Sequence, residues 1–336
     1  ATPPAGAPST PSAGALYSTS GDVTFTWGLG SASDPESGIS GYDLQVGTDA
    51  ASDASVFNGD AGNVFSKAFT GLAEGTYYTR VRAKNGYNLP GAYTPWSAVF
   101  KVDMTPPVPN PPVAGNHQVY ITSITWAAAV PADSLSGLHA QPYSFDNGAA
   151  WQAGASSTTA GLQPNSLYNK AIKYRDAAGN ITSGLAVSTY TLAAVPASVA
   201  FSNLATTGFI VGWAQNGNPG GTTYAAEIST FSNFSPVLAS SVTANTQADF
   251  TGLEVSVRYY ARVKAINQNN VSTAYAAAAS TYTLANPPTG TQVTSVPIGT
   301  VTLAWSGNGN SASTVYKIAR SLDNSNYEVL AATYSS

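Results

Sequence analysis

A tryptophan recurs at nearly even intervals along this 336-residue chain, each time in a similar segment. The intervals are 99, 87 and 92 residues, and the segments are Thr24-Phe25-Thr26-Trp27, Ser123-Ile124-Thr125-Trp126, Ile210-Val211-Gly212-Trp213 and Thr302-Leu303-Ala304-Trp305. Self-similarity at a fixed period indicates repeated structural units. The partial alternation of polar and apolar residues around each Trp is typical of a strand with one buried face. A period of about 90 residues fits one small β-sandwich.

A leucine and a tyrosine, five or six residues apart, follow each of the first three tryptophans. The pairs are Leu72 and Tyr77, Leu162 and Tyr168, and Leu253 and Tyr259. A turn-anchoring Leu and a Tyr whose hydroxyl bonds back to that turn form the tyrosine corner of Greek-key sandwiches. The sequence therefore predicts an all-β fold in which these pairs and the four tryptophans form the cores.

Strand-like segments around these landmarks resemble fibronectin type III modules. The resemblance lies in the Trp, in a tyrosine on the next strand (Tyr42, Tyr224 and Tyr316), and in Arg-Val-Arg-Ala-Lys-Asn and Arg-Val-Lys-Ala-Ile-Asn after the corner. It implies tandem Ig-like, fibronectin type III-like Greek-key β-sandwiches. Two further segments, Asp34-Pro35-Glu36-Ser37-Gly38 and Asp133-Ser134-Leu135-Ser136-Gly137, look like the Ig-like repeats of large bacterial surface proteins. This second resemblance implies a bacterial cell-surface or secreted protein.

Proline-rich junctions separate the repeats and predict the module boundaries. We expect Ig-like or fibronectin-like modules at residues 1–104 and 105–193, a fibronectin type III module at 194–284, and a partial one at 285–336. Because proline stiffens such connections, the modules are expected to form a semi-rigid rod.

The fourth repeat ends before its Leu/Tyr corner. Strands without their neighbours would leave an assembly edge that includes Trp305, Tyr316 and Ile318, and an unpaired hydrophobic edge favours pairing with another chain. Two explanations stay open: the sequence is an excerpt of a longer protein, or another copy supplies the missing strands and builds a filament.

Charged residues make up 9% of the chain, against roughly 25% in ordinary globular proteins, and the net charge is -4. No basic cluster could follow a phosphate backbone, so nucleic acid is not expected as a partner. No apolar run reaches the roughly 20 residues that cross a bilayer. The chain has no cysteine. A surface rich in Ser, Thr, Asn and Gly favours an extracellular or cell-surface location.

No catalytic constellation can be assembled from the sequence, so we expect no enzyme and no cofactor. The two histidines, His117 and His139, lack the spacing of a zinc site or a triad and are interpreted as surface loop residues. Calcium, which takes oxygen ligands from loops, is the one metal considered. Ordinary turn chemistry is the favoured reading of its candidate ligands, which are Asp34, Glu36, Asp133, Asp176 and Asn180.

Two aromatic residues outside the repeating core, Trp151 and Tyr87, are candidates for stacking on sugar rings if they are exposed. Packing within their own loops is the favoured reading. Asn180 and Asn270 each begin a glycosylation sequon. The leading hypothesis is an extracellular structural protein, a spacer or a filament or adhesin component, whose partners are further modules or copies of itself. The alternatives are a module that binds carbohydrate or a host protein, and an accessory spacer of a secreted polysaccharide hydrolase.

Overall fold

Only β-strands and loops make up the part of the chain that the computed structural model describes, residues 1–50 and 55–334. The chain divides into two compact units. One comprises Ala1–Gln118, Thr125–Thr158 and Asn169–Ser188, and the other comprises Val119–Ile124, Thr159–Tyr168 and Thr189–Ser336. The division into four modules remains a prediction, but the sheets can be described one pair at a time.

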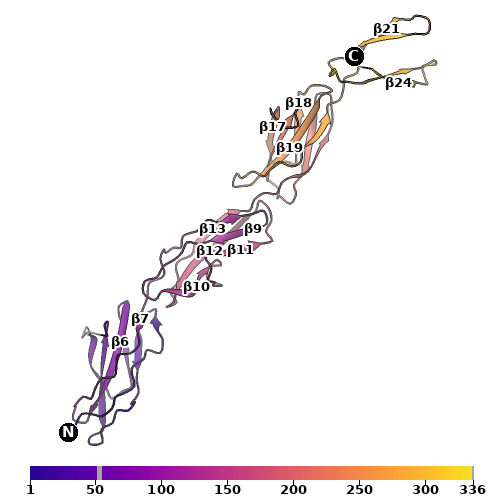
Figure 1. Ribbon diagram of the computed structural model, residues 1–336. Helices are drawn as coiled ribbons and strands as arrows, with labels where there is room; N and C mark the ends of the chain where they lie inside the picture. Colours follow the sequence, from indigo (N-terminus) through magenta and orange to yellow (C-terminus); the bar gives the residue numbers. More distant parts are fainter. Residues whose placement is uncertain (51–54, 335–336) are drawn as a thin grey trace. The chain divides into compact units, whose positions relative to one another are not determined.

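The N-terminal strands form two facing sheets (Figure 1). A five-stranded sheet has the order β1-β7-β6-β3-β4, and β2 pairs with β5. The alternation predicted from the sequence is clearest in β6, where every second residue from Tyr77 to Asn85 is buried. The strands are β1 (Tyr17–Ser18), β2 (Val23–Thr26), β3 (Ile39–Gly47), β4 (Ser55–Gly62), β5 (Ser66–Phe69), β6 (Gly75–Asn85) and β7 (Phe100–Val102).

The next six strands form two three-stranded sheets, β10-β12-β13 and β11-β9-β8. Trp126 on β9 and Tyr174 on β12 are fully buried. These strands are β8 (Gln118–Val119), β9 (Ser123–Ala127), β10 (Leu138–Ser144), β11 (Ser156–Ala160), β12 (Leu167–Asp176) and β13 (Leu185–Tyr190).

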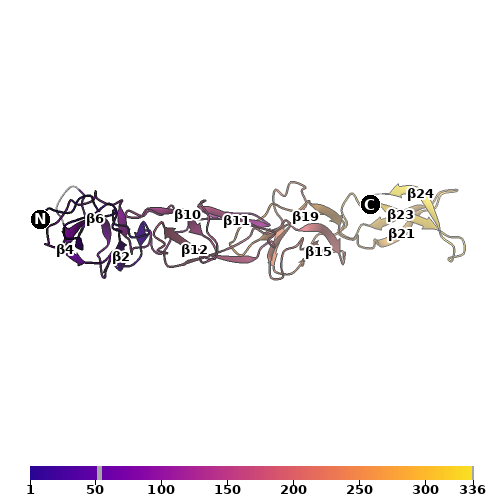
Figure 2. The ribbon, with the colours of Figure 1, turned by 90° about the horizontal axis from the view of Figure 1, so that it is seen from below.

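The third group has the clearest sandwich topology. Its two sheets have the orders β14-β15-β18 and β17-β16-β19-β20. The chain crosses from one sheet to the other between β15 and β16, between β17 and β18, and between β18 and β19, as in a Greek key. β15 and β19, one from each sheet, are labelled in Figure 2. The strands are β14 (Ala197–Ser202), β15 (Gly208–Ala214), β16 (Thr223–Ser229), β17 (Ala239–Thr243), β18 (Gln247–Thr251), β19 (Arg258–Ile266) and β20 (Ala279–Tyr282).

The last strands form two pairs, β21 with β22 and β23 with β24. A Trp and a Tyr pack edge to face here and in the first group, and Trp213 and Tyr224 pack at a tilt in the third group. The ring centroids lie 6.0 Å apart for Trp27 and Tyr42, and 5.6 Å for Trp305 and Tyr316. The strands are β21 (Thr289–Ser295), β22 (Thr302–Ser306), β23 (Tyr316–Arg320) and β24 (Glu328–Tyr334). The predicted all-β fold of tandem Ig-like sandwiches is confirmed.

Hydroxyl groups replace backbone carbonyls along one edge of several sheets. Thr182, which is 2% exposed, accepts the Tyr174 N–H through Oγ1 at 2.9 Å and donates its own N–H to Tyr174 O. Thr94 and Thr273 accept the N–H groups of Val81 and Ala265 in the same way. These edge segments are therefore paired without being regular strands.

Candidate functional site

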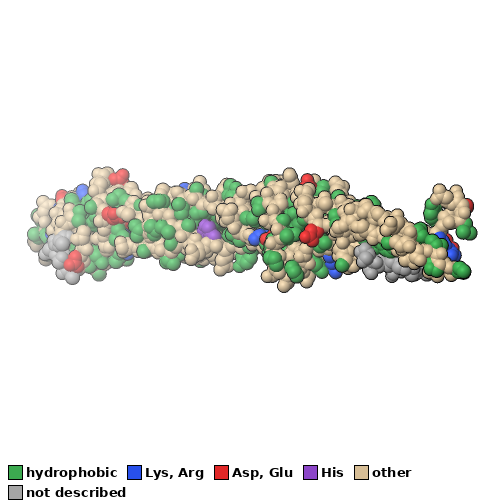
Figure 3. Space-filling model, turned by 90° about the horizontal axis from the view of Figure 1, so that it is seen from above, with side chains coloured by type: hydrophobic (Ala, Val, Ile, Leu, Met, Phe, Trp, Pro, Cys, Tyr) green, Lys and Arg blue, Asp and Glu red, His purple; other side chains and the backbone are tan. Residues whose placement is uncertain are grey.

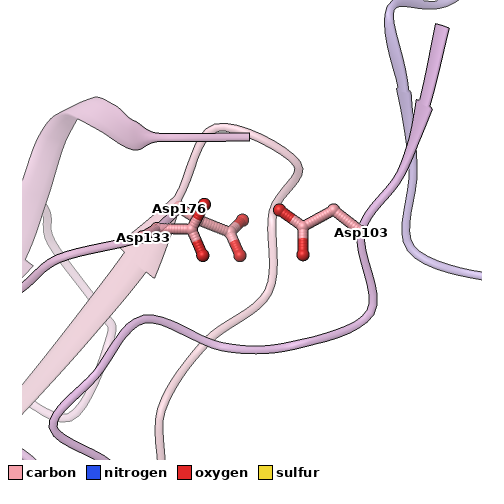
Figure 4. Close-up of side chains that lie close together, drawn as sticks. All are labelled: Asp103, Asp133 and Asp176. Carbon is pink, nitrogen blue, oxygen red and sulfur yellow. The ribbon is translucent and has the colours of Figure 1, made fainter. Parts of the chain in front are cut away.

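Three carboxylates gather in the first unit, close to where the chain passes from β7 toward β8. Asp103, Asp133 and Asp176 each place a carboxylate oxygen within 4.8 Å of the others (Figure 4). They come from the segment after β7, from the loop after β9 and from the end of β12. Asp103 and Asp176 are fully buried. Three acidic side chains this close together form a candidate site. The way in which the protein stabilises their negative charges has to be explained.

Asp103 is bound from several sides. Its Oδ2 accepts the Ser136 N–H at 3.0 Å, and its Oδ1 accepts the Thr105 N–H at 3.3 Å. Its backbone N–H donates to Ser18 O, and its carbonyl oxygen accepts from Asn180 Nδ2 at 2.8 Å. Side chain and backbone together fix this residue between two sandwiches.

The other two carboxylates close turns. Asp176 Oδ1 accepts the N–H groups of Gly179 and Asn180 at 2.7 and 2.8 Å, and its Oδ2 accepts from Asn180 Nδ2. Asp133 Oδ1 accepts the Gly137 N–H at 2.7 Å. This is the chemistry by which Asp caps the backbone of its own loop.

Burial raises the pKa of Asp176 above its ordinary value, and the nearby charge of Asp103 adds to the rise. The hydrogen bonds from Asn180 and Gly179 act in the opposite direction without cancelling it. Desolvation disfavours the charged form of a buried carboxyl. Negative charge within the cluster is therefore disfavoured by burial and by repulsion, but hydrogen-bond donors of the protein stabilise it.

A calcium ion takes six to eight oxygen ligands, whereas this cluster offers three carboxylates. Both oxygens of Asp103 and of Asp176 already accept hydrogen bonds from N–H groups of the protein. We therefore interpret the cluster as hydrogen-bonded loop structure. The sequence candidates Asp133, Asp176 and Asn180 do come together here, whereas Asp103 was not among them.

The remaining calcium candidates lie in a loop of the first sandwich. Asp34 Oδ1 accepts the N–H groups of Glu36 and Ser37, and its Oδ2 accepts from Asn85 Nδ2 at 2.9 Å. The hydrogen bonds from Asn85 and Ser37 hold the pKa of Asp34 below its usual value. Glu36 is exposed and accepts the Thr2 N–H at 3.4 Å.

A recurring contact, which the sequence alone did not reveal, binds each sandwich to the segment that enters it. The side chains responsible, here called the entry amides, bind backbone groups of that segment. Asn218 pairs with Ala194, accepting from its N–H and donating to its carbonyl at 2.8 Å each. The other entry amides are Asn85 on Thr2 O, Asn180 on Asp103 O, Asn267 on Thr191 O, and Asn310 on the N–H and carbonyl of Asn286.

The signal for the entry amides is partly visible in the sequence. Asn218 and Asn310 both lie five residues after the recurring Trp, and Asn85 and Asn267 both lie eight residues after the corner Tyr. In the first two groups, backbone bridges between Ala5 and Ser33 and between Val108 and Ala132 take the position of the Asn218 pairing.

The two aromatic candidates lie in different loops. Tyr87 is 65% exposed in the turn after β6. Trp151, after β10, is half-buried, with the Arg175 guanidinium 4.5 Å from its ring centroid. Trp151 is therefore already stacked on a cation of the protein.

Most residues proposed for the cores are buried. Trp27, Trp126, Trp213, Leu72, Tyr77, Leu253 and Tyr259 are at most 9% exposed, whereas Leu162 and Tyr168 are half-buried. The tyrosine hydroxyls bond to their turns: Tyr77 donates to Ala73 O, and Tyr168 and Tyr259 accept the N–H groups of Gln163 and Glu254. In the last group, Tyr316 is 9% exposed, and Trp305 and Ile318 are half-buried.

The interpretation of the two histidines as surface loop residues is wrong for His139 and holds only in part for His117, which lies in the irregular segment before β8. His139 lies within β10. His117 is half-buried, and its ring packs edge to face against Trp126 with centroids 5.1 Å apart. The sequence did not reveal this packing, because the segment before β8 has the composition of a loop. Only a few of its backbone groups pair with β9.

No protein-family model matches the sequence, and no curated protein matches it. Several solved structures are similar to this chain. The chicken CNTN1 FN1-FN3 domains are 16% identical, with 83% of this chain and all of that chain covered and a TM-score of 0.27. A myokine structure and the fibronectin type III domain of human fibronectin type III domain containing protein 3 are also 16% identical to this chain. The match covers 98% of the first of these chains and 86% of the second. Each covers 27% of this chain, with a TM-score of 0.25. The fold assignment rests on the sheet orders and cores described above.

Among residues 1–50 and 55–334, no helix is long and apolar enough to cross a membrane.

Proposed function

We propose that this chain is an extracellular structural protein, a semi-rigid spacer built from consecutive β-sandwich modules, with no catalytic role. Its partners are further modules or other copies of itself. The observation that carries the proposal is the set of entry amides, because four of them, Asn180, Asn218, Asn267 and Asn310, bind the backbone between one group of strands and the next.

The contacts at the junction after β7 illustrate the argument. Besides Asn180 on Asp103 O, Lys101 Nζ donates to Leu135 O at 2.5 Å, and Tyr17 Oη donates to Ser136 O at 3.4 Å. Hydrogen bonds that bridge two sandwiches oppose the relative domain motion that is the default for small interfaces.

A second junction, within the other unit, is bound by different side chains in the same manner. Asn165 Nδ2 donates to Thr222 Oγ1 at 2.9 Å, its Oδ1 accepts the Gln268 N–H, and Asn269 donates to Thr189 Oγ1. Asn165 and Thr222 are at most 3% exposed. Polar groups held at such low exposure need their partners, so separation of the sandwiches is costly.

The surface also suits a spacer in an extracellular setting. Figure 3 shows few acidic or basic side chains on the visible face, scattered among hydrophobic side chains and uncharged surface, in keeping with the 9% charged residues of the chain. Such a surface presents little that would attract nucleic acid or acidic lipid.

Distance measurements between spin labels test the stiffness of the first junction. The chain has no cysteine, so cysteines introduced at exposed Thr24 and Ala186 label both sides specifically. We expect a narrow distance distribution in the parent chain and a broad one after Asn180→Ala. A label pair at Thr24 and Val56, within one sandwich, should be unaffected by that substitution. An equally broad distribution across the junction in the parent chain would contradict the proposal.

A further inference from the structure

The segment before β8 pairs with β9 by an unusual combination of groups. Gly115 N–H donates to Ala127 O at 2.9 Å, and Ala129 N–H donates to Val113 O at 2.8 Å. The N–H of Ala127, however, donates to Nδ1 of His117 at 3.0 Å. A ring nitrogen thus occupies the place that a backbone carbonyl takes in an ordinary antiparallel ladder.

This hydrogen bond requires a neutral imidazole. Nδ1 accepts only when it carries no proton, which places the ring proton on Nε2. Packing against Trp126 holds the ring in position at a centroid distance of 5.1 Å. Burial lowers the pKa of His117 below its ordinary value, in keeping with a ring that stays neutral near pH 7.

The titratable residues of the two sheets around this ring lie in the facing sheet rather than in its own sheet. The strands of its own sheet, β8, β9 and β11, contain no Asp, Glu, Lys or Arg. In the facing sheet, Tyr174 is buried and donates to Val113 O and Ala129 O, so it reinforces the same pairing. Burial raises the pKa of Tyr174, and it raises that of Tyr143 as well. The other titratable residues of that sheet are His139, Tyr168, Lys170, Lys173, Arg175, Asp176 and Tyr190.

We propose that His117 is an acid-sensitive link that fastens residues 113–118 to β9. A proton taken from solvent onto Nδ1 turns the acceptor into a donor that faces the Ala127 N–H, and the pairing is lost at that point. The inference does not depend on the proposed spacer function, because it concerns one hydrogen bond within the fold.

The direction of the pH dependence follows from the lowered pKa. A histidine that binds its proton more weakly in the folded state contributes stability above its unfolded pKa of about 6.5 and loses it as the pH falls toward the folded pKa. Since one proton is involved, the local opening equilibrium increases by at most about tenfold per pH unit in that window.

Amide exchange by NMR on the full chain tests the proposal at a single atom. We expect the protection factor of the Ala127 N–H to fall as the pH is lowered from about 7 to about 5. His117→Asn keeps an acceptor close to the position of Nδ1 and should make the protection independent of pH in this range. His117→Phe keeps a ring against Trp126 without an acceptor and should give low protection throughout.

His139 provides the matched control. Its Nδ1 accepts the N–H of Gln141, two residues further along the same strand, so His139→Asn should leave the Ala127 profile unchanged. Nitrogen shifts of the two labelled histidines report the tautomer directly. The proposal is overturned if Nδ1 of His117 carries the proton at about pH 7, or if the parent chain and His117→Asn show the same protection at every pH.

Discussion

Asn218 pairs with the backbone of Ala194 through both polar atoms of its amide, with two hydrogen bonds of 2.8 Å. Asn218 is 3% exposed and Ala194 is 6% exposed. The Asn218 side chain therefore takes the place of a backbone partner in a β-bridge. It holds a linker that has no regular strand pairing against its sandwich.

Replacing Asn218 with Ala leaves the buried N–H and carbonyl of Ala194 without these partners. We expect the local free energy of opening to fall by about 2–6 kcal/mol, since each of the two unsatisfied buried groups costs about 1–3 kcal/mol. Hydrogen exchange of β14 and β15 in the full chain measures it. Asn216 donates to Val195 O but is exposed and has a φ of 53°, so Asn216→Gly, which tolerates that φ, should cost less than about 1 kcal/mol. Equal losses in both variants would argue against a special role for Asn218.

The hydroxyl of Thr182 is predicted to matter more than its methyl group. Thr182→Val keeps the shape but leaves the Tyr174 N–H without its acceptor, at an expected cost of about 1–3 kcal/mol. Thr182→Ser keeps the hydroxyl and should cost about 0.8 kcal/mol, the value of one buried methylene-sized group. Exchange of the Tyr174 amide distinguishes them, and a Val variant as stable as the Ser variant would refute the prediction.

The Arg262 guanidinium stacks on two aromatic rings, with Cζ 4.3 Å from the centroid of Phe234 and 3.9 Å from that of Tyr275. It also binds Glu227 through Nε and an NH2 group. Arg262→Lys removes the planar stack and the two-point contact, and we expect a loss of about 1 kcal/mol. A double-mutant cycle with Tyr275→Ala isolates the stacking contribution. A coupling energy of zero would mean that the arrangement only fills space.

The pKa of Asp176 should respond to Asp103. Asp103→Asn removes a neighbouring negative charge and is expected to lower the pKa of Asp176 while leaving it above the ordinary value, because burial is the larger cause. Carboxyl carbon shifts measured by NMR follow the titration, with Asp146→Asn, in another loop, as the control. A pKa of Asp176 unchanged by Asp103→Asn would show that the two charges do not interact.

The raised pKa also fixes the sign of the contribution of Asp176 to stability. The folded state holds the proton more tightly than the unfolded state, so this group stabilises the fold at low pH. That contribution is lost as the pH rises from about 3.8 through the folded pKa. Asp34 and Asp146, whose pKa values are lowered by hydrogen bonds, contribute in the opposite sense. Their stabilisation is present above their unfolded pKa and is lost on acidification.

The fold was predictable because its signals are local and repeated. The Trp and the corner Tyr recur at fixed spacing, and alternation identifies the buried face of strands such as β6. The contacts at the junctions could not be predicted in this way. Asp103 lies close to Asp133 and Asp176 only in the folded chain, because several strands separate them in the sequence. Tyr275 shows the same limit: it lies between β19 and β20 on an irregular segment, where no alternation reveals that it covers Arg262.

Hydroxyl pairing at Thr94, Thr182 and Thr273 has a consequence for how such a chain folds. Similar modules joined in series face one another at high effective concentration, and complementary strand edges could then pair between the wrong neighbours. An edge whose backbone partners are threonine hydroxyls offers no even row of carbonyls and N–H groups to an incoming strand. At these three positions threonine, which at first suggests only a polar surface, thus pairs with a strand of its own sandwich.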